Sequence, residues 1–389
     1  MDNYINVFHE IILYNGDFYL NEPKKVFLHN RMDNITYTFK DINIIPQNEL
    51  KNVIDYDKFT LLIDGFHKNM GHLMWDAMYT SWYGLFFHDE KMWNENFQWI
   101  TLHNSFQKNN KTWHCNILEK FSGNKITTPV LLSKGFNKPL KIKLLICGIK
   151  NLGIGCVDKN ICANTSFKNH ITNPVETFIN RIYLRYNIVR NNYINNNSNI
   201  NKIIYVHNKR PYKGINMLFS ELNNKYKNVY NFIYINWAKY TFAEQLNILN
   251  TTRIIICGVG TARTNSPFVP NGSVEIQTND HNNKLPYNIS YFDCHIGTLS
   301  KYLKVFNINS YTNKECNQKS ISKELLPLIE NTLKIVPYNN NFNIEDNLPT
   351  FINTIKHKLS DKDFNIWRNK YSNCIEDIYE YILLKDNDI

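Results

Sequence analysis

The sequence predicts an α/β protein of two domains, and three observations support this. The chain has 389 residues, which is too long for a single ordinary hydrophobic core and suits two domains. Apolar runs typical of strands alternate with helical segments over residues 202–277. The polar, low-complexity segment "NNYINNNSNIN" at residues 191–201 precedes them and is typical of a linker. We therefore expect an N-terminal domain at residues 1–190, a linker at 191–201 and a C-terminal domain at 202–310.

The N-terminal half mixes short strand-like runs such as "TLLIDGF" and "IKLLICGI" with aromatic helical stretches. The segment Asn69–Phe87, "NMGHLMWDAMYTSWYGLFF", is apolar on almost every side, which predicts a buried helix. His72 and Asp76 are four residues apart and share one helix face with Asn69. Buried polar groups need partners or serve a site. Either a core His–Asp hydrogen bond closes the helix end, or Asp76 fixes the tautomer of a histidine that accepts a proton.

The region after the linker alternates regularly between the two kinds of element. Strands are expected at "KIIYVHN", "NVYNFIYINW", "RIIICG" and "GSVEIQ", and helices at "KGINMLFSELNNKY" and "TFAEQLNILNTT". Thr241 and Glu244 have the spacing of a capping box at the start of the second helix. This alternation predicts a parallel sheet with right-handed crossovers. A helical tail is expected at residues 311–389.

A glycine-rich turn, Cys257-Gly258-Val259-Gly260, directly follows the third of these strands. Ligands bind at the carboxyl ends of parallel strands, and glycine lets the backbone come close to them. Exposed N–H groups of such a turn form an anion site. We expect side-chain donors and a cation from the following segment, at Thr264, Asn265, Ser273 and Arg263. Arg263 stands where a dinucleotide fingerprint needs its third glycine, and the alternative is a tight strand-to-helix turn with no ligand.

The net charge of +10 favours anionic partners, but the lysines are scattered and form no basic helix or tail. Phosphate-bearing metabolites are therefore expected rather than nucleic acid, and a merely soluble basic surface is the simplest alternative.

Several features point away from metals and membranes. The eight cysteines form no C-x-x-C pair, and Cys147 and Cys257 lie in apolar runs typical of buried thiols. The acidic triplets Asp55-Tyr56-Asp57 and Asp361-Lys362-Asp363 lie before a strand and in the helical tail, where a metal-diphosphate site is not expected. The sequence shows no signal peptide and no long apolar stretch, so we expect no membrane span and a cytoplasmic location.

Taken together, the helix that carries His72 and the glycine-rich turn resemble glycosyltransferase family 61. The N-terminal element reads Asn69-Met70-Gly71-His72 followed by Asp76, and the later one reads Gly258-Val259-Gly260 followed by "TNSPFVPNGS" at residues 264–273. The resemblance covers residues 202–277 and the helix near His72. The chain departs from the family pattern at Cys257, which replaces a histidine, and between Gly260 and Thr264, where the segment is two residues longer.

The resemblance implies a GT-B-like fold, in which two Rossmann-like domains face a cleft and the helical C-terminal tail crosses back. It implies an inverting glycosyltransferase that moves a sugar from a nucleotide-sugar to a hydroxyl of a glycan or glycoprotein, with no cofactor required. The alternative is a non-catalytic glycan- or nucleotide-sugar-binding protein on the same fold.

The residues expected to act lie in the helix near His72, in the basic segment after the strand "KIIYVHN" and in and after the glycine-rich turn. The expected catalytic residues are His72, Asp76 and Asn69. The expected donor-binding residues are Lys209, Arg210, Gly258, Gly260, Arg263, Thr264, Asn265 and Glu275. Glu275 is assigned to the ribose hydroxyls, with a solvent-facing residue after a strand as the alternative.

Overall fold

The computed structural model of the chain divides into two compact units. It describes residues 6–28, 36–63, 70–102, 113–147, 174–194, 200–207, 214–258, 264–277, 304–307, 318–337 and 360–371. Unit 1 comprises residues 1–161 and 180–186, and unit 2 comprises residues 162–179 and 187–389. The division runs through helix α5 (Pro174–Arg185). The domain boundaries expected from the sequence stay a prediction.

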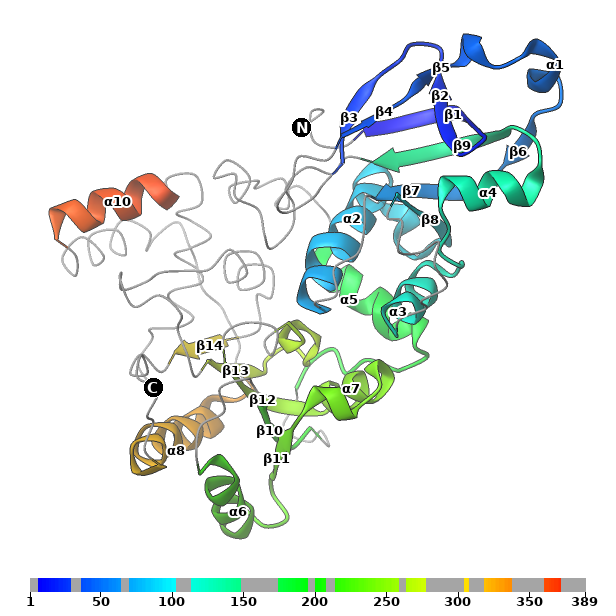
Figure 1. Ribbon diagram of the computed structural model, residues 1–389. Helices are drawn as coiled ribbons and strands as arrows, with labels where there is room; N and C mark the ends of the chain where they lie inside the picture. Colours follow the sequence, from blue (N-terminus) through cyan, green and yellow to red (C-terminus); the bar gives the residue numbers. More distant parts are fainter. Residues whose placement is uncertain are drawn as a thin grey trace. The chain divides into compact units, whose positions relative to one another are not determined.

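Unit 1 is built on a seven-stranded mixed sheet with the order β5-β2-β1-β9-β7-β8, and β6 pairs with β9 (Figure 1). The strands are β1 (Asn6–Tyr14), β2 (Asp17–Leu20), β5 (Lys40–Asp41), β6 (Ile54–Tyr56), β7 (Phe59–Ile63), β8 (Phe97–Thr101) and β9 (Leu140–Cys147). A separate two-stranded sheet joins β3 (Lys25–Phe27) to β4 (Thr36–Thr38). Strands β9, β7 and β8 are parallel, whereas β1 is antiparallel to both β9 and β2. The parallel pattern of a Rossmann-like domain is therefore only part of this sheet.

The antiparallel part comes from a tight hairpin. Asn15 and Gly16 join β1 to β2 with φ angles of 48° and 86°, the left-handed conformation that a two-residue hairpin turn of type I′ requires at both positions. A Cβ atom at Gly16 would lie 2.7 Å from Cγ2 of Val130. Glycine is therefore required there by both the backbone and the space.

The helices of unit 1 include one that is buried along most of its length. They are α1 (Gln47–Leu50), the π-helix η2 (His72–Met78), α2 (Tyr79–His88), α3 (Trp113–Ser122), α4 (Pro129–Phe136) and part of α5, with short 3-10 turns η1 (Ile42–Ile44) and η3 (Glu90–Asn94). Residues 70–88 are helical throughout, and every side chain described between Leu73 and Phe86 is buried. The buried helix expected from the sequence is confirmed.

One charged side chain lies in the interior of unit 1. Arg181 of α5 is 0% exposed and donates to the carbonyl oxygens of Trp93, Glu95 and Phe121, at 2.7–3.2 Å. Its guanidinium also lies over the rings of Phe97 and Phe121. Burial, followed by the charge of Arg185, lowers the pKa of Arg181. Arg181 thus joins α5 to η3 and α3 through main-chain carbonyls.

Unit 2 is built on a five-stranded parallel sheet with the order β11-β10-β12-β13-β14. The strands are β10 (Lys202–Val206), β11 (Asn231–Ile235), β12 (Thr252–Cys257), β13 (Val274–Gln277) and β14 (Lys304–Asn307). All four neighbouring pairs are parallel. The first four strands are those expected from the sequence, and the order of the five is that of a doubly wound α/β fold.

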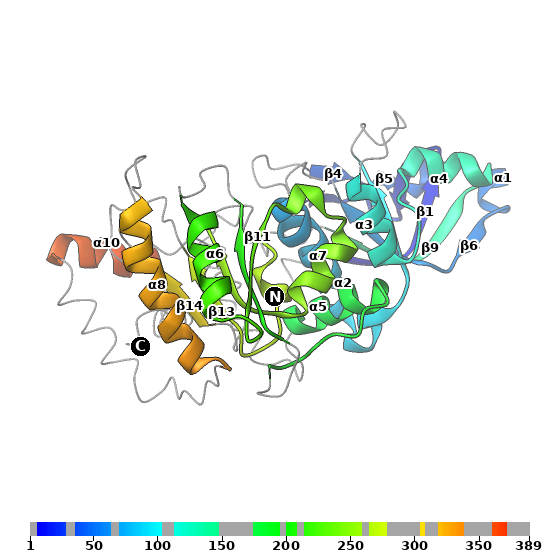
Figure 2. The same ribbon diagram turned by 90° about the horizontal axis from the view of Figure 1, so that it is seen from below.

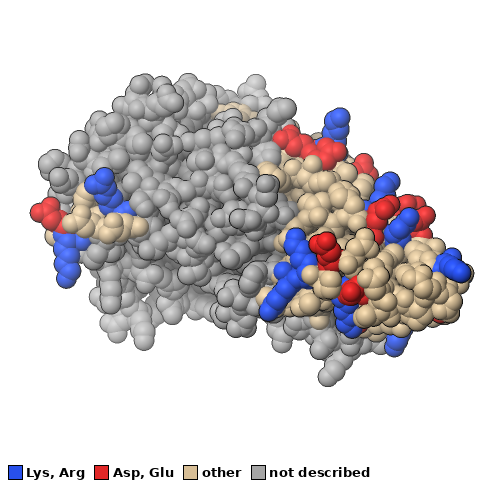
Figure 3. All heavy atoms as spheres, turned by 90° about the horizontal axis from the view of Figure 1, so that it is seen from above, with Lys and Arg blue, Asp and Glu red and all other residues tan. Residues whose placement is uncertain are grey.

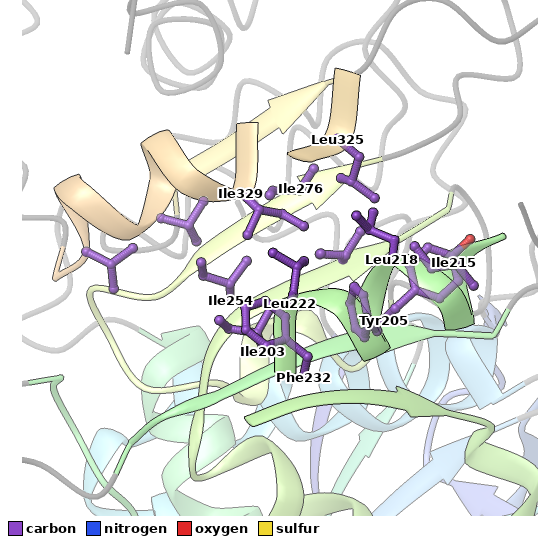
Figure 4. Packing of buried hydrophobic residues seen from close by; sticks show 14 of the residues in the cluster. Ile203, Tyr205, Ile215, Leu218, Leu222, Phe232, Ile254, Ile276, Leu325 and Ile329 are labelled. Carbon is purple, nitrogen blue, oxygen red and sulfur yellow. The ribbon is translucent and has the colours of Figure 1, made fainter. Parts of the chain in front are cut away.

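Helices cover both faces of this sheet. They are α6 (Ile215–Lys225), α7 (Phe242–Leu249) and α8 (Gln318–Ile335). The unit also contains the 3-10 turns η6 (Trp237–Lys239) and η8 (Ser266–Phe268) and the helix α10 (Asp361–Tyr371). Leu218 and Leu222 of α6 and Leu325 and Ile329 of α8 pack on one face, against strand residues such as Ile254 (Figure 4). Helix α7 lies on the opposite face in both ribbon views (Figures 1 and 2).

Two expectations for the helices of this unit have different outcomes. The capping box of α7 is confirmed, because the Thr241 hydroxyl accepts from the Glu244 N–H and the Glu244 carboxylate accepts from the Thr241 N–H. Helix α8, in the expected tail, packs into the core of unit 2, and the crossing of the tail to the other domain stays a prediction, as does the GT-B arrangement. None of the described helices is long and apolar enough to cross a bilayer.

Candidate functional site

The strand order of unit 2 places a switch point between β10 and β12. These strands are parallel neighbours, and they end at Val206 and Cys257. From β10 the chain proceeds to one side of the sheet through β11, and from β12 it proceeds to the other side. Ligands of open α/β sheets bind outside the carboxyl ends of the strands at such a point.

Most of the expected donor-binding residues follow these two strand ends. Gly258 comes directly after β12 and is buried. Lys209 and Arg210 follow β10, and Gly260 and Arg263 follow Gly258; these four lie outside the described residues. Their position in the chain puts them after the two strands that flank the switch point.

Two helices begin beside the carboxyl edge, and their N-terminal turns differ. Helix α6 follows β10; its N-cap is Gly214, with φ of 82° and no side chain, and its first turn has no acidic residue. The first turn of α7 instead holds the Glu244 carboxylate in its capping box. Because the N-terminal end of a helix attracts anions, the start of α6 is the more favourable place for a phosphate.

His207 is a candidate that the sequence interpretation missed. It directly follows β10, its backbone N–H donates to the Ile235 carbonyl at 2.7 Å, and its Nδ1 hydrogen-bonds the Tyr234 hydroxyl. Burial raises the pKa of Tyr234. The available signal was a polar histidine at the end of an apolar strand, "KIIYVH".

A buried polar cluster lies next to Gly258. The Cys257 thiol donates to Oε1 of Glu275 at 3.5 Å and lies 3.7 Å from the Ser266 hydroxyl, and all three residues are at most 1% exposed. The solvent-facing alternative for Glu275 is therefore wrong. A buried carboxylate needs hydrogen-bond donors. The thiol of Cys257, the last residue of β12, supplies one to Glu275 of β13 and so links the two strands. A role at the ribose hydroxyls stays a prediction.

Thr264 and Asn265 lie in the middle of the connection from β12 to β13, and they are 6% and 4% exposed. The Asn265 amide Nδ2 donates to Oε1 of Gln245 in α7 at 2.9 Å. Gln245 Nε2 donates in turn to the carbonyls of Trp237 and Tyr240, both at 3.1 Å. This network joins the segments that follow β11 and β12.

The last residues of the same connection lie away from the carboxyl ends of the strands. Ser273 immediately precedes β13, and its hydroxyl donates at 3.1 Å to the carbonyl of Thr252, the first residue of β12. Since β12 and β13 are parallel, Ser273 lies at their amino ends. The expectation that Ser273 adds a donor to the anion site is therefore wrong; its hydroxyl closes the amino edge of the sheet.

The expected catalytic residues lie at the start of the buried helix of unit 1. His72 and Asp76 fall within the π-helix η2 rather than the regular helix that the spacing argument assumed, and the backbone N–H of Tyr79 bonds the Met74 carbonyl five residues earlier. Their side chains and all of Asn69 lie outside the described residues. Single π-turns inside helices are frequent at functional sites.

The two acidic triplets have different surroundings. Asp55, in β6, forms an ion pair with Lys141 at 3.0 Å, and Asp361 begins α10. Within the described part of the chain, no group of three or more His, Cys, Asp or Glu residues is placed to hold a metal ion.

Charges of both signs are mixed on the surface. On the face drawn in Figure 3, the Lys and Arg side chains of the described residues stand among Asp and Glu side chains. The described surface on this face therefore lacks the continuous basic stripe that is typical of nucleic-acid binding.

The comparison with known families covers both motif regions. The family model described as "Glycosyltransferase 61" matches residues 70–276, slightly more than half of the 389 residues. A search of curated proteins finds no match to the chain. The family match begins two residues before His72 and ends one residue after Glu275. The chain therefore belongs to glycosyltransferase family 61, and this membership supports glycosyltransferase activity.

Proposed function

We propose that the protein transfers a sugar, with inversion, from a nucleotide-sugar to a hydroxyl group of a glycan or glycoprotein. The donor's diphosphate binds at the carboxyl ends of β10 and β12. The groups that hold it are the backbone around Gly258 and Gly260, the start of α6 and the basic side chains of Lys209, Arg210 and Arg263.

The observation that carries this proposal is the strand order of unit 2. A parallel sheet with the order β11-β10-β12-β13-β14 has its switch point at β10 and β12. The chain segments that follow these two strands contain the two glycines and all three basic residues named above. The position expected for an anionic ligand thus coincides with the residues suited to bind one.

The chemistry requires a base and a stabilised leaving group. The acceptor oxygen forms a bond to the anomeric carbon while the bond from that carbon to the phosphate oxygen breaks. The acceptor proton passes to His72, with Asp76 fixing the imidazole tautomer, and the nucleoside diphosphate leaves with the bonding electrons. Backbone N–H groups and guanidinium groups stabilise its growing negative charge without a bound metal.

The transfer reaction tests the catalytic role of the histidine. Wild-type protein and the His72→Ala variant are assayed for sugar transfer and for nucleotide-sugar hydrolysis, after a thermal-shift screen of nucleotide-sugars has found a donor that raises the melting temperature. We expect His72→Ala to slow transfer about 10²–10⁴-fold while donor binding persists. His88→Ala is the matched control, since His88 is an exposed residue at the end of the same helical segment.

Two outcomes would count against this proposal. If the wild type binds a nucleotide-sugar but transfers its sugar to none of the acceptors tested, the non-catalytic binding protein is favoured. Equal transfer rates for His72→Ala and His88→Ala would remove His72 from the reaction.

A glycine substitution tests the anion site itself. Gly260→Val is expected to abolish nucleotide binding and leave the fold intact, because the added side chain keeps the phosphate away from the backbone. Gly135→Val in α4 is the control, since a Cβ atom at Gly135 meets nothing within 4 Å. Nucleotide affinity that is unchanged by Gly260→Val would place the diphosphate elsewhere.

A further inference from the structure

One buried amide group in unit 2 has an acceptor atom that no described residue satisfies. Asn265 is 4% exposed, and its Oδ1 has no hydrogen-bond partner among the described residues. Buried polar groups are nearly always paired, because removing them from water costs free energy that a hydrogen bond must offset. An unpaired acceptor in the segment that leaves β12 therefore indicates a missing partner.

The identity of this atom follows from the network around it. An asparagine amide can be placed in two orientations, and its neighbours decide between them. Gln245 Nε2 donates to two carbonyl oxygens, those of Trp237 and Tyr240. Reversing the Gln245 amide would set its oxygen against both carbonyls, so Oε1 must be the atom that faces Asn265.

The orientation of Asn265 is fixed by the same reasoning. Because Gln245 presents an oxygen, Asn265 must turn its Nδ2 toward it, and the two atoms are 2.9 Å apart. The remaining polar atom of Asn265 is then a carbonyl oxygen. Its missing partner must be a hydrogen-bond donor.

A second unpaired group belongs to this network. The indole N–H of Trp237, whose backbone carbonyl accepts from Gln245, is buried and has no partner among the described residues. The network links the segments after β11 and β12, which both leave the carboxyl edge of the sheet. An acceptor and a donor without partners therefore occur together in the network at the edge where a ligand is expected.

We propose that Asn265 accepts a hydrogen bond from the nucleoside of the sugar donor, and that Gln245 is a positioning residue that holds the Asn265 amide in the accepting orientation. This inference rests on the proposed function. The ligand group it selects is a hydrogen-bond donor, either a ribose hydroxyl or a ring N–H of the base.

Binding of UDP and GDP to the full-length protein, measured by calorimetry, tests the inference. Each nucleotide is compared with its 2′-deoxy and 3′-deoxy analogues and with the analogue methylated on its ring N–H. The wild type is expected to bind one of these analogues about tenfold more weakly than the parent nucleotide. The deoxy compounds identify a ribose hydroxyl as the partner, and the methylated ones identify a base N–H.

Substitutions then assign the effect to the network. Asn265→Ala should weaken binding of the parent nucleotide about tenfold and remove the discrimination against the analogue. Gln245→Met should also reduce the discrimination, because the Asn265 amide becomes free to rotate. Asn247→Ala, an exposed amide on the same helix, should change nothing.

The discrimination ratio separates ligand recognition from a purely structural role, which would lower stability and leave the ratio unchanged. An unchanged ratio in Asn265→Ala for every analogue would overturn the inference while the proposed function stands. A discrimination ratio in Gln245→Met equal to that of the wild type would overturn the positioning role. Failure of the wild type to bind either nucleotide would count against the nucleotide site itself, and the inference would fall with it.

Discussion

The two units are both built on a central sheet, but the two sheets differ in strand direction. Unit 1 has a mixed sheet, because the β1–β2 hairpin adds antiparallel strands to the parallel group of β9, β7 and β8. Unit 2 has a parallel sheet throughout, with helices on both faces and a switch point between β10 and β12. The difference teaches where ligand chemistry can be inferred from topology alone. In unit 2 the strand order locates the site, whereas in unit 1 the candidate residues are identified by their motif.

The interiors of the units differ as well. Unit 1 places a charged side chain, Arg181, inside its core and satisfies it with main-chain carbonyls. Unit 2 buries the Glu275 carboxylate, which accepts from the Cys257 thiol of the neighbouring strand, and α6 and α8 pack on its sheet through apolar side chains. We therefore expect substitutions in the two units to differ widely in their effect on the free energy of unfolding.

The largest effect is expected at Arg181. Arg181→Met keeps much of the side-chain length but removes the guanidinium donors from the carbonyl oxygens of Trp93, Glu95 and Phe121, which costs on the order of 3–5 kcal/mol of unfolding free energy. Denaturant titration followed by tryptophan fluorescence measures it. Arg185→Met is the control, because Arg185 makes one hydrogen bond, to the Asn94 carbonyl, in the contacts described.

This variant also tests whether the units are separate cores. If they are, the transition of unit 1 shifts and that of unit 2 stays in place. A loss below about 1 kcal/mol would contradict the role given to the buried guanidinium.

An intermediate effect is expected at the start of α7. Thr241→Ala removes the N-cap and should cost about 1 kcal/mol at neutral pH, whereas Thr241→Ser should retain stability. Hydrogen bonds from the backbone N–H and then the hydroxyl of Thr241 lower the pKa of Glu244 from 4.5. A carboxylate with a lowered pKa stabilises the fold above pH 4.5 and loses that contribution as the pH falls through its folded pKa. The difference between wild type and Thr241→Ala should thus narrow in acid, and a difference that widens there would refute the capping role.

The smallest effect is expected at the ion pair between α6 and α8. Lys225 and Glu330 are 2.5 Å apart, but Lys225 is 56% exposed, so water and salt weaken the attraction. Lys225→Ala should leave the denaturation midpoint unchanged within error at physiological salt. A clear shift would mean that charge, rather than the apolar contacts of Ile329 and Leu222, holds α8 on the sheet.

The same contrast explains how much could be predicted from sequence. Regular alternation revealed β10 to β13, α6 and α7, because each strand and helix of a parallel α/β unit is a local pattern. The hairpin in unit 1 was missed although "YNGD" carries the Asn-Gly turn signal at residues 15 and 16. Strand β14 was also missed.

The site shows where local patterns stop. The glycine turn and the basic residues could be read from the chain, but the enclosure of Glu275 depends on Cys257, 18 positions away in sequence. The Asn265–Gln245 contact spans 20 positions and depends on how α7 packs beside η8. Ser273 was misassigned although the predicted parallel sheet already implies that the start of the strand "GSVEIQ" lies at the amino edge, as the structure shows.

The central claim is that the segments after the carboxyl ends of β10 and β12 bind the phosphates of the donor. Backbone hydrogen exchange with and without UDP or GDP tests this claim most directly. We predict slower exchange on nucleotide binding at residues 207–217 and 258–265, which follow those two strands. Protection confined to unit 1, or to the amino edge around Ser273, would contradict the claim.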